Sequence, residues 1–225
     1  MSPSSRALPS AALRERILSK ARAAPAPNAS EVAKKRVALA VAALVPALVL
    51  LGVLGIGPKG RPLALALLVS VGWGAIAVTC SLFVFSGRSP LGRSRPALAV
   101  LAALAPTLAL SISAIGIVLY PDTWSGVLAP QNHAMCMMFG LAMGAAPLAA
   151  MMFHLRGLDP VSPHVRGAAL GATAGAWAGT GAMLLCPHHT LAHVLVGHVL
   201  PVVLFALIGA IVGGRVLALR PRAES

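Results

Sequence analysis

The chain alternates between long apolar stretches and short polar connections. Six apolar stretches contain no Asp, Glu, Lys or Arg. An α-helix rises 1.5 Å per residue, so about 20 residues cross the roughly 30 Å hydrocarbon layer of a bilayer, and each stretch has about this length. The pattern predicts an all-α polytopic membrane protein, a six-helix transmembrane bundle. The predicted spans are residues 37–57, 63–85, 97–119, 133–153, 167–186 and 190–213.

Basic residues are distributed unevenly between the two sides of this predicted bundle. All but two of the 18 Lys and Arg residues fall in the tails and in the second and fourth connections, and the other two, Lys59 and Arg61, lie in the first. Basic residues resist translocation, so both termini are predicted to face the cytoplasm across the cell inner membrane. The chain then divides into a cytoplasmic N-terminal segment (1–36), a transmembrane domain (37–213) and a cytoplasmic tail (214–225).

Composition supports this prediction and narrows the expected partners. The chain has 58% hydrophobic and only 10% charged residues, with a mean hydropathy of +0.86, whereas soluble domains carry about 25% charge. The net charge of +13 does not require nucleic acid, because basic residues that bracket spans face anionic lipid headgroups. We therefore expect membrane lipid as a partner and no direct nucleic-acid contact. The first span follows a basic segment without a clear cleavage site, which predicts an uncleaved anchor.

The N-terminal segment contains a short amphipathic pattern. Ser10 is a plausible helix N-cap, and Leu13, Ile17 and Leu18 follow on one helical face before a Pro-rich joint at 24–28. So short a helix needs a partner for order in water. Three interpretations are compatible with the pattern: docking into the groove of a partner protein, lying on the inner leaflet, or disorder without a role. For docking, the candidate partner-binding residues are Leu13, Arg14, Ile17 and Leu18.

Thiols and imidazoles collect at the outer ends of the last three spans. They are His133 and Cys136 at the start of the fourth, Cys186 at the end of the fifth, His188 and His189 in the turn that follows, and His193 in the sixth. His189 and His193 are four residues apart, which predicts that they share a helical face. His198 lies deeper and needs a polar partner. Cys80, alone in the second span, is expected only to pack.

Three interpretations of this outer group stay open. Cys136 and Cys186 form a disulfide or a redox-sensing pair, as an oxidising exterior favours. Alternatively, thiolates and imidazoles bind zinc, copper or another soft metal, with His133, His188, His189 and His193 as candidate ligands. In the third interpretation they are only small thiols and interfacial histidines. No cofactor is expected.

A glycine pattern in the fifth span predicts close helix packing. The span carries three consecutive GxxxG steps, at Gly167, Gly171, Gly175 and Gly179. A bare glycine face lets another backbone approach closely, which is a source of packing energy in a membrane. The fifth span is therefore expected at the centre of the bundle or, through this face, at a homodimer contact.

Catalysis is not expected from this sequence. The spans hold no Asp, Glu or Lys, and the chain has no paired carboxylates, nucleophile elbow, phosphate-binding loop or H-E-x-x-H motif. The main alternative is a haem- or quinone-linked redox subunit of the membrane that uses His189 and His193 as ligands.

These features together resemble a known family. Six spans, a short cytoplasmic N-terminal segment, and Cys136 and Cys186 near the outer face, the latter followed by four histidines before Pro201, resemble the NrsF-type integral-membrane anti-sigma factors. Within that family, they most resemble the carotenogenesis regulators of myxobacteria. The resemblance implies a negative regulator that holds an extracytoplasmic-function sigma factor at the inner membrane. It also implies release by a signal such as light-generated singlet oxygen, with carotenoid synthesis as an output. On this view Leu13, Ile17 and Leu18 contact the sigma factor, and Cys136 with Cys186 senses the signal.

Overall fold

The structure, a computed structural model, describes the part of the chain that contains the second to sixth predicted spans. The described residues are 62–85, 94–121, 130–156 and 162–218, with single positions at 15, 19, 38, 45 and 49. The chain divides into two units, Met1–Arg36 and Val37–Ser225, and the helices below belong to the second. The predicted span 37–57 falls almost wholly outside the described residues, as do Leu13, Arg14, Ile17 and Leu18.

The described elements are helices that match the second to sixth predicted spans. They are α3 (Leu63–Phe85), α4 (Arg95–Leu119), α5 (Pro130–His154) and α6 (Pro163–Leu185), followed by a last span made of α7 (Leu191–Val194), the π-helix η1 (Leu195–Val199) and α8 (Leu200–Val216). Five helices in the described part of the chain are long and apolar enough to cross a membrane. The all-α class is confirmed, and the structure describes five such helices where the sequence predicted six.

One helix boundary differs from the prediction for a physical reason. α6 begins at Pro163, four residues before the predicted Gly167, with Ser162 at the N-cap position and Pro at the first turn. Proline suits the first turn of a helix because it has no backbone N–H to leave unsatisfied. Arg166 consequently lies inside the helix and is only 6% exposed.

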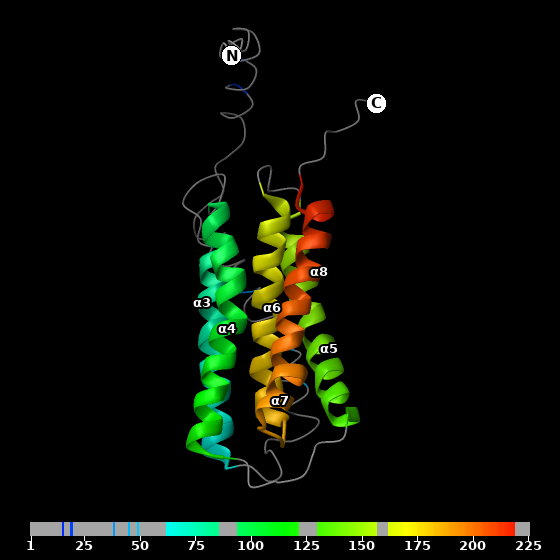
Figure 1. The fold of residues 1–225 in the computed structure, drawn as a ribbon. Coiled ribbons are helices and arrows are strands. Elements are labelled where there is room, and N and C mark those ends of the chain that lie inside the picture. The colour runs from blue at the N-terminus through cyan, green and yellow to red at the C-terminus, as the bar shows by residue number, and fades with distance from the viewer. Residues whose placement is uncertain are drawn as a thin grey trace, which may run out of the picture. The chain divides into compact units, whose positions relative to one another are not determined.

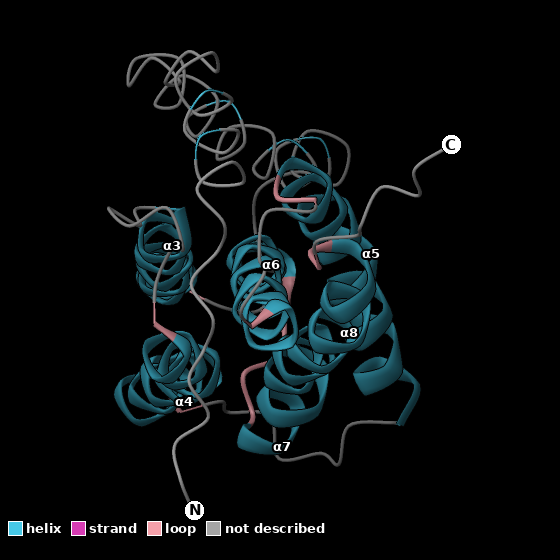
Figure 2. Cartoon of the chain, turned by 90° about the horizontal axis from the view of Figure 1, so that it is seen from above, coloured by secondary structure: helices cyan, strands magenta, loops and turns pink. Residues whose placement is uncertain are grey.

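The helices run side by side, and α6 lies at their centre. Figure 1 shows the helices along a common direction, and Figure 2, which looks along them, shows α6 between α3 and α4 on one side and α5 and α8 on the other. The buried share of the most apolar part of α6 is 78%, against 22% for α4. The expectation that the glycine-rich span forms the centre is therefore confirmed.

The GxxxG face of α6 is filled by α8 of the same chain. A methyl group added at Gly167 would collide with the backbone of Gly209, and one added at Gly171 would collide with the backbone of Phe205. The two helices therefore pack with their backbones in contact, as small residues permit in a membrane. The face predicted for a homodimer, at Gly167, Gly171, Gly175 and Gly179, is used within the chain, because α8 occupies most of it and the ring of Trp73 packs on Gly179.

Two buried tryptophans join the helices through serine hydroxyls. Trp73 of α3 donates from Nε1 to Oγ of Ser113 on α4 at 3.1 Å. Trp177 of α6 donates from Nε1 to Oγ of Ser81 on α3 at 3.0 Å. A buried indole N–H needs such an acceptor, because leaving it unpaired in an apolar interior costs free energy. These bonds fix the register of α3 against its two neighbours.

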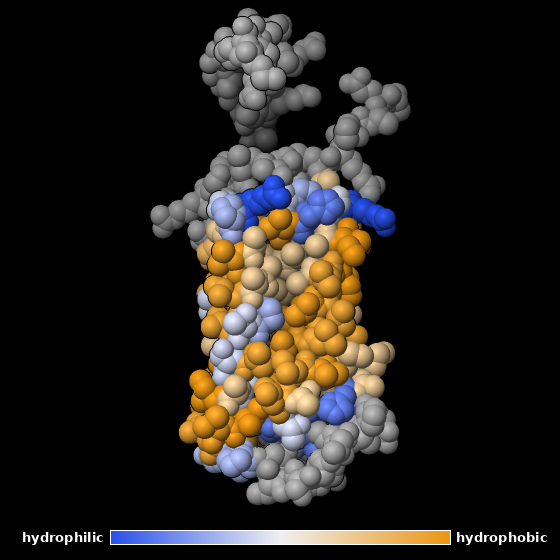
Figure 3. Space-filling view, in the orientation of Figure 1, coloured by the Kyte–Doolittle hydropathy of each residue, from blue (hydrophilic) through white to orange (hydrophobic). Residues whose placement is uncertain are grey.

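The bundle has an apolar middle and two chemically different ends. Figure 3 shows an apolar band along the helices with polar side chains at both ends. The four arginines that the structure describes all lie at one end, since helices of alternating direction start or finish there: Arg95, Arg156, Arg166 and Arg215. The described cysteines and histidines of the predicted outer group lie at the opposite end.

Candidate functional site

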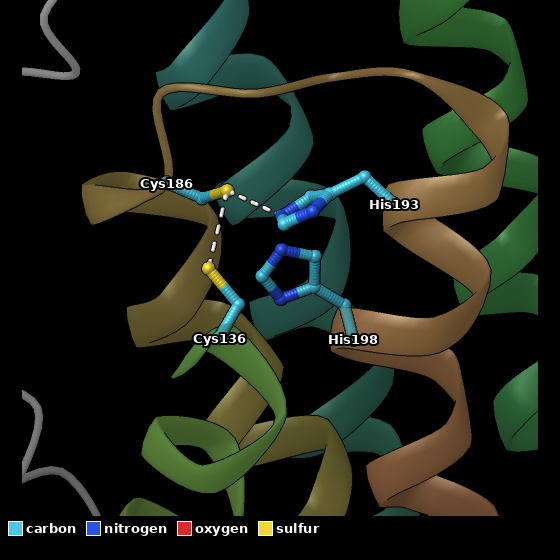
Figure 4. A group of neighbouring side chains, drawn as sticks. All are labelled: Cys136, Cys186, His193 and His198. Atoms are coloured by element: carbon cyan, nitrogen blue, oxygen red, sulfur yellow. Dashed lines mark hydrogen bonds between the residues drawn. The ribbon is translucent and has the colours of Figure 1, made fainter. Parts of the chain in front are cut away.

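At the end opposite the arginines, four side chains from three spans meet in a compact cluster. Cys136 comes from α5, Cys186 directly follows α6, and His193 and His198 come from the last span (Figure 4). One sulfur or nitrogen atom from each lies within 4.8 Å of the corresponding atom of all the others. We call these four residues the thiol–imidazole cluster.

A short reversal of the chain brings the last span to this position. Cys186 ends α6 in an extended conformation, with φ −72° and ψ 123°, and its N–H donates to the carbonyl of Ala182. Pro187 follows and cannot continue the helix. Thr190 then caps the next helix, because its side chain accepts a hydrogen bond from the backbone N–H of His193. His193 thus enters the bundle within one turn of the cap, facing the end of α6.

The π-helix places His193 and His198 on the same side of the last span. In an α-helix of 3.6 residues per turn, positions five apart point about 140° away from each other. The i→i+5 hydrogen bonds of η1 bring such positions closer to alignment, and π-helical turns are frequent at functional sites. The ring centroids of the two histidines are 5.2 Å apart. A regular helix would have turned one ring away from the cluster.

The two sulfurs are in contact but are not joined in a disulfide. Sγ of Cys136 lies 3.8 Å from Sγ of Cys186, whereas a disulfide bond is about 2.05 Å long. Sγ of Cys186 also lies 3.0 Å from Nε2 of His193 and 3.3 Å from the backbone oxygen of His188. Gly197 leaves space for the side chain of Cys136 beside Cys186, because a Cβ at position 197 would be 3.2 Å from Cβ of Cys136.

His193 is the centre of a group of imidazole rings in edge-to-face or tilted contact. Its ring centroid lies 5.1 Å from that of His133 and 5.5 Å from that of His188, in addition to the contact with His198. His193 is 0% exposed, His198 2% and Cys186 3%. Among the described residues, the buried Nδ1 atoms of His133 and His193 have no hydrogen-bond partner. Buried unpaired nitrogens cost free energy, so such a concentration is unusual for a purely structural end of a bundle.

The structure therefore brings together some of the predicted residues and separates others. Cys136, Cys186 and His193 share the cluster, and His133 and His188 touch its edge through the ring of His193. His189 lies elsewhere: it is buried against α4, and a Cβ at Gly116 would be 2.8 Å from its Nε2. The prediction that His189 and His193 share a helical face is wrong, because the helix begins at Leu191 and His189 precedes it.

His198 was not among the predicted ligands, although it belongs to the cluster. Its depth in the span and its need for a polar partner were visible in the sequence. The five-residue spacing between His193 and His198 argued against a shared helical face, because positions five apart are aligned by a π-helix and not by an α-helix. Cys80 is 3% exposed and packs among apolar side chains of the core, as expected.

The bundle has a cavity at the end that holds the cluster and a groove at the arginine end. A cavity of about 160 Å³ borders the cluster and is lined by Cys136, Cys186 and His198 together with apolar side chains. Small-molecule cofactor sites usually have about 300–1,000 Å³, so this cavity suits an ion or a small oxidant rather than haem or quinone. At the arginine end, a groove of about 550 Å³ between α5 and α8 has apolar walls, with Arg156 and Arg215 among its lining residues.

Fold and cluster together define a class of protein. It is a helical bundle whose long apolar helices can cross a membrane, with arginines at one end and a buried thiol–imidazole cluster at the other. Within this class, the family model NrsF, described as negative regulator of sigma F, matches residues 20–218, and the chain belongs to that family. The family resemblance of the sequence is thereby confirmed. Searches among curated proteins and among solved structures find no match.

Membership gives the protein its general role. It is a negative regulator of a sigma factor, so its partner is a sigma factor, and its family is one of regulators rather than of enzymes. The match begins at residue 20, which leaves Leu13, Arg14, Ile17 and Leu18 before the matched part of the chain.

Proposed function

We propose that the protein is an anti-sigma factor of the cell inner membrane that holds an extracytoplasmic-function sigma factor and releases it when Cys136 and Cys186 are oxidised. The observation that carries this proposal is the 3.8 Å contact between their sulfurs. Two thiols this close, brought together from separate helices of a sigma-factor regulator, are placed to react with each other. The alternative of a haem- or quinone-linked subunit has less support, because the cavity beside the cluster is small.

The charge distribution supports an orientation for this function. Arginines at one end of the described bundle favour the cytoplasm, since basic residues resist translocation. The end of α8 then faces the cytoplasm and the thiol–imidazole cluster faces the periplasm. The N-terminus shares the cytoplasmic side when residues 37–57 form the predicted first span. The groove between α5 and α8 fits this placement, because an acyl chain suits its apolar walls and a lipid phosphate suits Arg156 and Arg215. Anionic membrane lipid is thus a proposed partner at the inner face.

In this orientation the N-terminal segment is the part that reaches the sigma factor. Leu13, Ile17 and Leu18 form its proposed apolar edge, with Arg14 beside them. An amphipathic helix that docks its apolar side into a groove is a common mode of peptide recognition. These residues lie outside the described part of the chain, so the proposal for them depends on the sequence pattern alone.

The chemistry of release is an oxidation of two thiols by one oxidant. For light-generated singlet oxygen acting on a metal-free pair, the two S–H groups give up two protons and two electrons, an S–S bond forms, and the oxygen leaves as hydrogen peroxide. In that metal-free form Nε2 of His193, 3.0 Å from Sγ of Cys186, is placed to accept the first proton. Genes for carotenoid synthesis are a suitable output, because carotenoids quench singlet oxygen.

Closing the sulfur pair changes the packing of the helices. The S–S distance would shorten from 3.8 Å to about 2.05 Å, which draws the start of α5 toward the end of α6. α6 packs backbone to backbone on α8, so a shift at its end reaches the arginine end. The sigma factor is released only as far as the oxidised and reduced states differ in affinity for it.

The test is capture of the sigma factor by the full-length protein. Tagged protein from cells grown in the dark and solubilised in detergent should retain a two-domain sigma factor, and exposure to singlet oxygen should release it. Deleting residues 1–36 should abolish capture, whereas Cys80→Ser, which changes a cysteine outside the cluster, should leave it intact. Recovering no sigma factor from dark-grown cells would remove the proposal.

A further inference from the structure

We propose that Cys136, Cys186, His193 and His198 form a zinc site, which the reduced protein holds as its resting ligand. This inference deepens the proposed function, because it names what occupies the same thiol pair before the signal arrives. It does not depend on how the sigma factor is bound.

The donor set is one that zinc prefers. Structural zinc sites are almost always tetrahedral and built from cysteine sulfurs and histidine nitrogens, with two of each as a common combination. The cluster offers two sulfurs and two imidazoles, all within 4.8 Å of one another. Here the donors come from α5, the end of α6 and the last span.

The spacing of the sulfurs agrees with a shared metal ion. Two sulfurs bound at the Zn–S length of about 2.3 Å with a tetrahedral angle are about 3.8 Å apart, and the observed separation of Cys136 and Cys186 is 3.8 Å. A sulfur and a nitrogen around the same ion would be about 3.5 Å apart, and Cys186 and His193 are at 3.0 Å. The widest pair of donor atoms, at up to 4.8 Å, closes with side-chain movements of about 1 Å.

Burial and the direction of its ring nitrogens prepare His193 for this role. The residue is 0% exposed, Nε2 faces the sulfur of Cys186, and Nδ1 is buried with no hydrogen-bond partner among the described residues. A neutral imidazole carries one N–H and one lone pair. With the hydrogen on Nδ1, the lone pair of Nε2 points toward the sulfurs, and this is the form of histidine that binds a metal.

The backbone of the last span is shaped to the cluster. The π-helix η1 aligns His198 with His193, and Gly197 between them admits the side chain of Cys136. A π-turn and a glycine inside a membrane helix both weaken it locally, and such features persist where a function requires them. Four protein donors, three of them buried, make a closed site, which is typical of structural rather than catalytic zinc.

The zinc site also explains how oxidation changes the fold. Two thiolates bound to Zn²⁺ lose two electrons to the oxidant and form the Cys136–Cys186 disulfide. Singlet oxygen takes these electrons with two protons from water and becomes hydrogen peroxide, while Zn²⁺ leaves with its charge unchanged. Two of four ligands are lost, so the ion no longer ties α5, α6 and the last span together.

The experiment measures zinc in the purified full-length protein. Protein prepared in detergent under reducing conditions, then dialysed to remove loose metal, should contain about one zinc ion per chain. Cys136→Ser and His198→Asn should each lower this by about tenfold or more, and Cys80→Ser should not change it. Added Co²⁺ should give a thiolate-to-metal absorption band that is lost in Cys136→Ser. Wild-type protein without zinc, or equal zinc in wild type and in both ligand variants, would overturn the site.

A second measurement covers ligand variants that fail to fold. In the wild-type protein, alkylation of Cys136 and Cys186 should accelerate by about tenfold when a chelator removes the metal, whereas alkylation of Cys80 should stay constant. Unchanged alkylation of the pair overturns the proposal. Sigma-factor capture, measured in the same preparation, separates the two proposals: zinc without capture contradicts the anti-sigma function, and capture without zinc contradicts the metal site.

Discussion

The sulfurs of Cys136 and Cys186 lie 3.8 Å apart although the residues are separated by 50 positions in the chain. The contact depends on α5 and α6 packing together and on Gly197, which leaves room for Cβ of Cys136. A chemical change at this pair therefore acts on three spans at once.

Replacing Cys136 with Ser should abolish the response to singlet oxygen, so that expression of the sigma-dependent genes is the same in the dark and on exposure. The hydroxyl is similar in size to the thiol but cannot form a disulfide, so the oxidised state is unreachable. A reporter driven by the sigma-dependent promoter measures expression under both conditions. Cys80→Ser serves as the matched control and should respond normally. Normal induction in Cys136→Ser would assign this thiol to packing.

Replacing Leu13 and Ile17 together with Asp should free the sigma factor and switch on its genes without any signal. An aspartate cannot enter an apolar groove without a large desolvation cost, so affinity should fall by at least 100-fold, or about 3 kcal/mol. The same reporter and the capture experiment measure this. Glu15→Gln changes an exposed position of the same segment and should have little effect. Constant repression by the double variant would contradict the docking role.

The apolar pattern predicted the spans well because period and length are properties of local sequence. Residues 63–85 were predicted and found without change, and the glycine face predicted the central place of α6. The apolar pattern does not predict which helix packs against this glycine face. Gly209 and Gly213 of α8 pack against Gly167, so the glycine face is filled by a contact within the chain.

The cluster was only partly predictable for a different reason. Cys136 and Cys186 were recognisable because both sit at predicted span ends of the same side. His198 was not recognisable as a member of the cluster, because its alignment with His193 requires the π-helix between them. The hydrophobic periodicity of a sequence does not predict a single π-helical turn. The prediction for His189 failed because Thr190 caps the last span and the helix begins at Leu191, so helical spacing does not apply to His189.

Replacing Gly171 with Leu should separate α6 from α8 and destabilise the bundle. The new side chain would collide with the backbone of Phe205, which cannot move aside as a flexible side chain can. Overpacking typically costs about 1–3 kcal/mol, and a backbone clash lies at the upper end or beyond. Thermal unfolding in detergent measures the change. Gly74→Ala is the matched control: its Cβ would lie 3.5 Å from Thr180, an ordinary contact, so a similar loss there would contradict this account.

Replacing Ser113 with Ala should destabilise the contact between α3 and α4, because Nε1 of Trp73 loses its acceptor at 3.1 Å. Hydrogen bonds between membrane helices contribute about 0.6–1.7 kcal/mol to the free energy of unfolding. The expected loss is near the upper value, because the substitution leaves a buried indole N–H unpaired. Thermal unfolding measures the loss, and a shift in tryptophan fluorescence reports the altered indole environment. Ser111→Ala removes an exposed hydroxyl that donates only to the carbonyl of Thr107 in its own helix, so it should be nearly neutral. Equal effects of the two substitutions would show that the Trp73 bond does not hold these helices together.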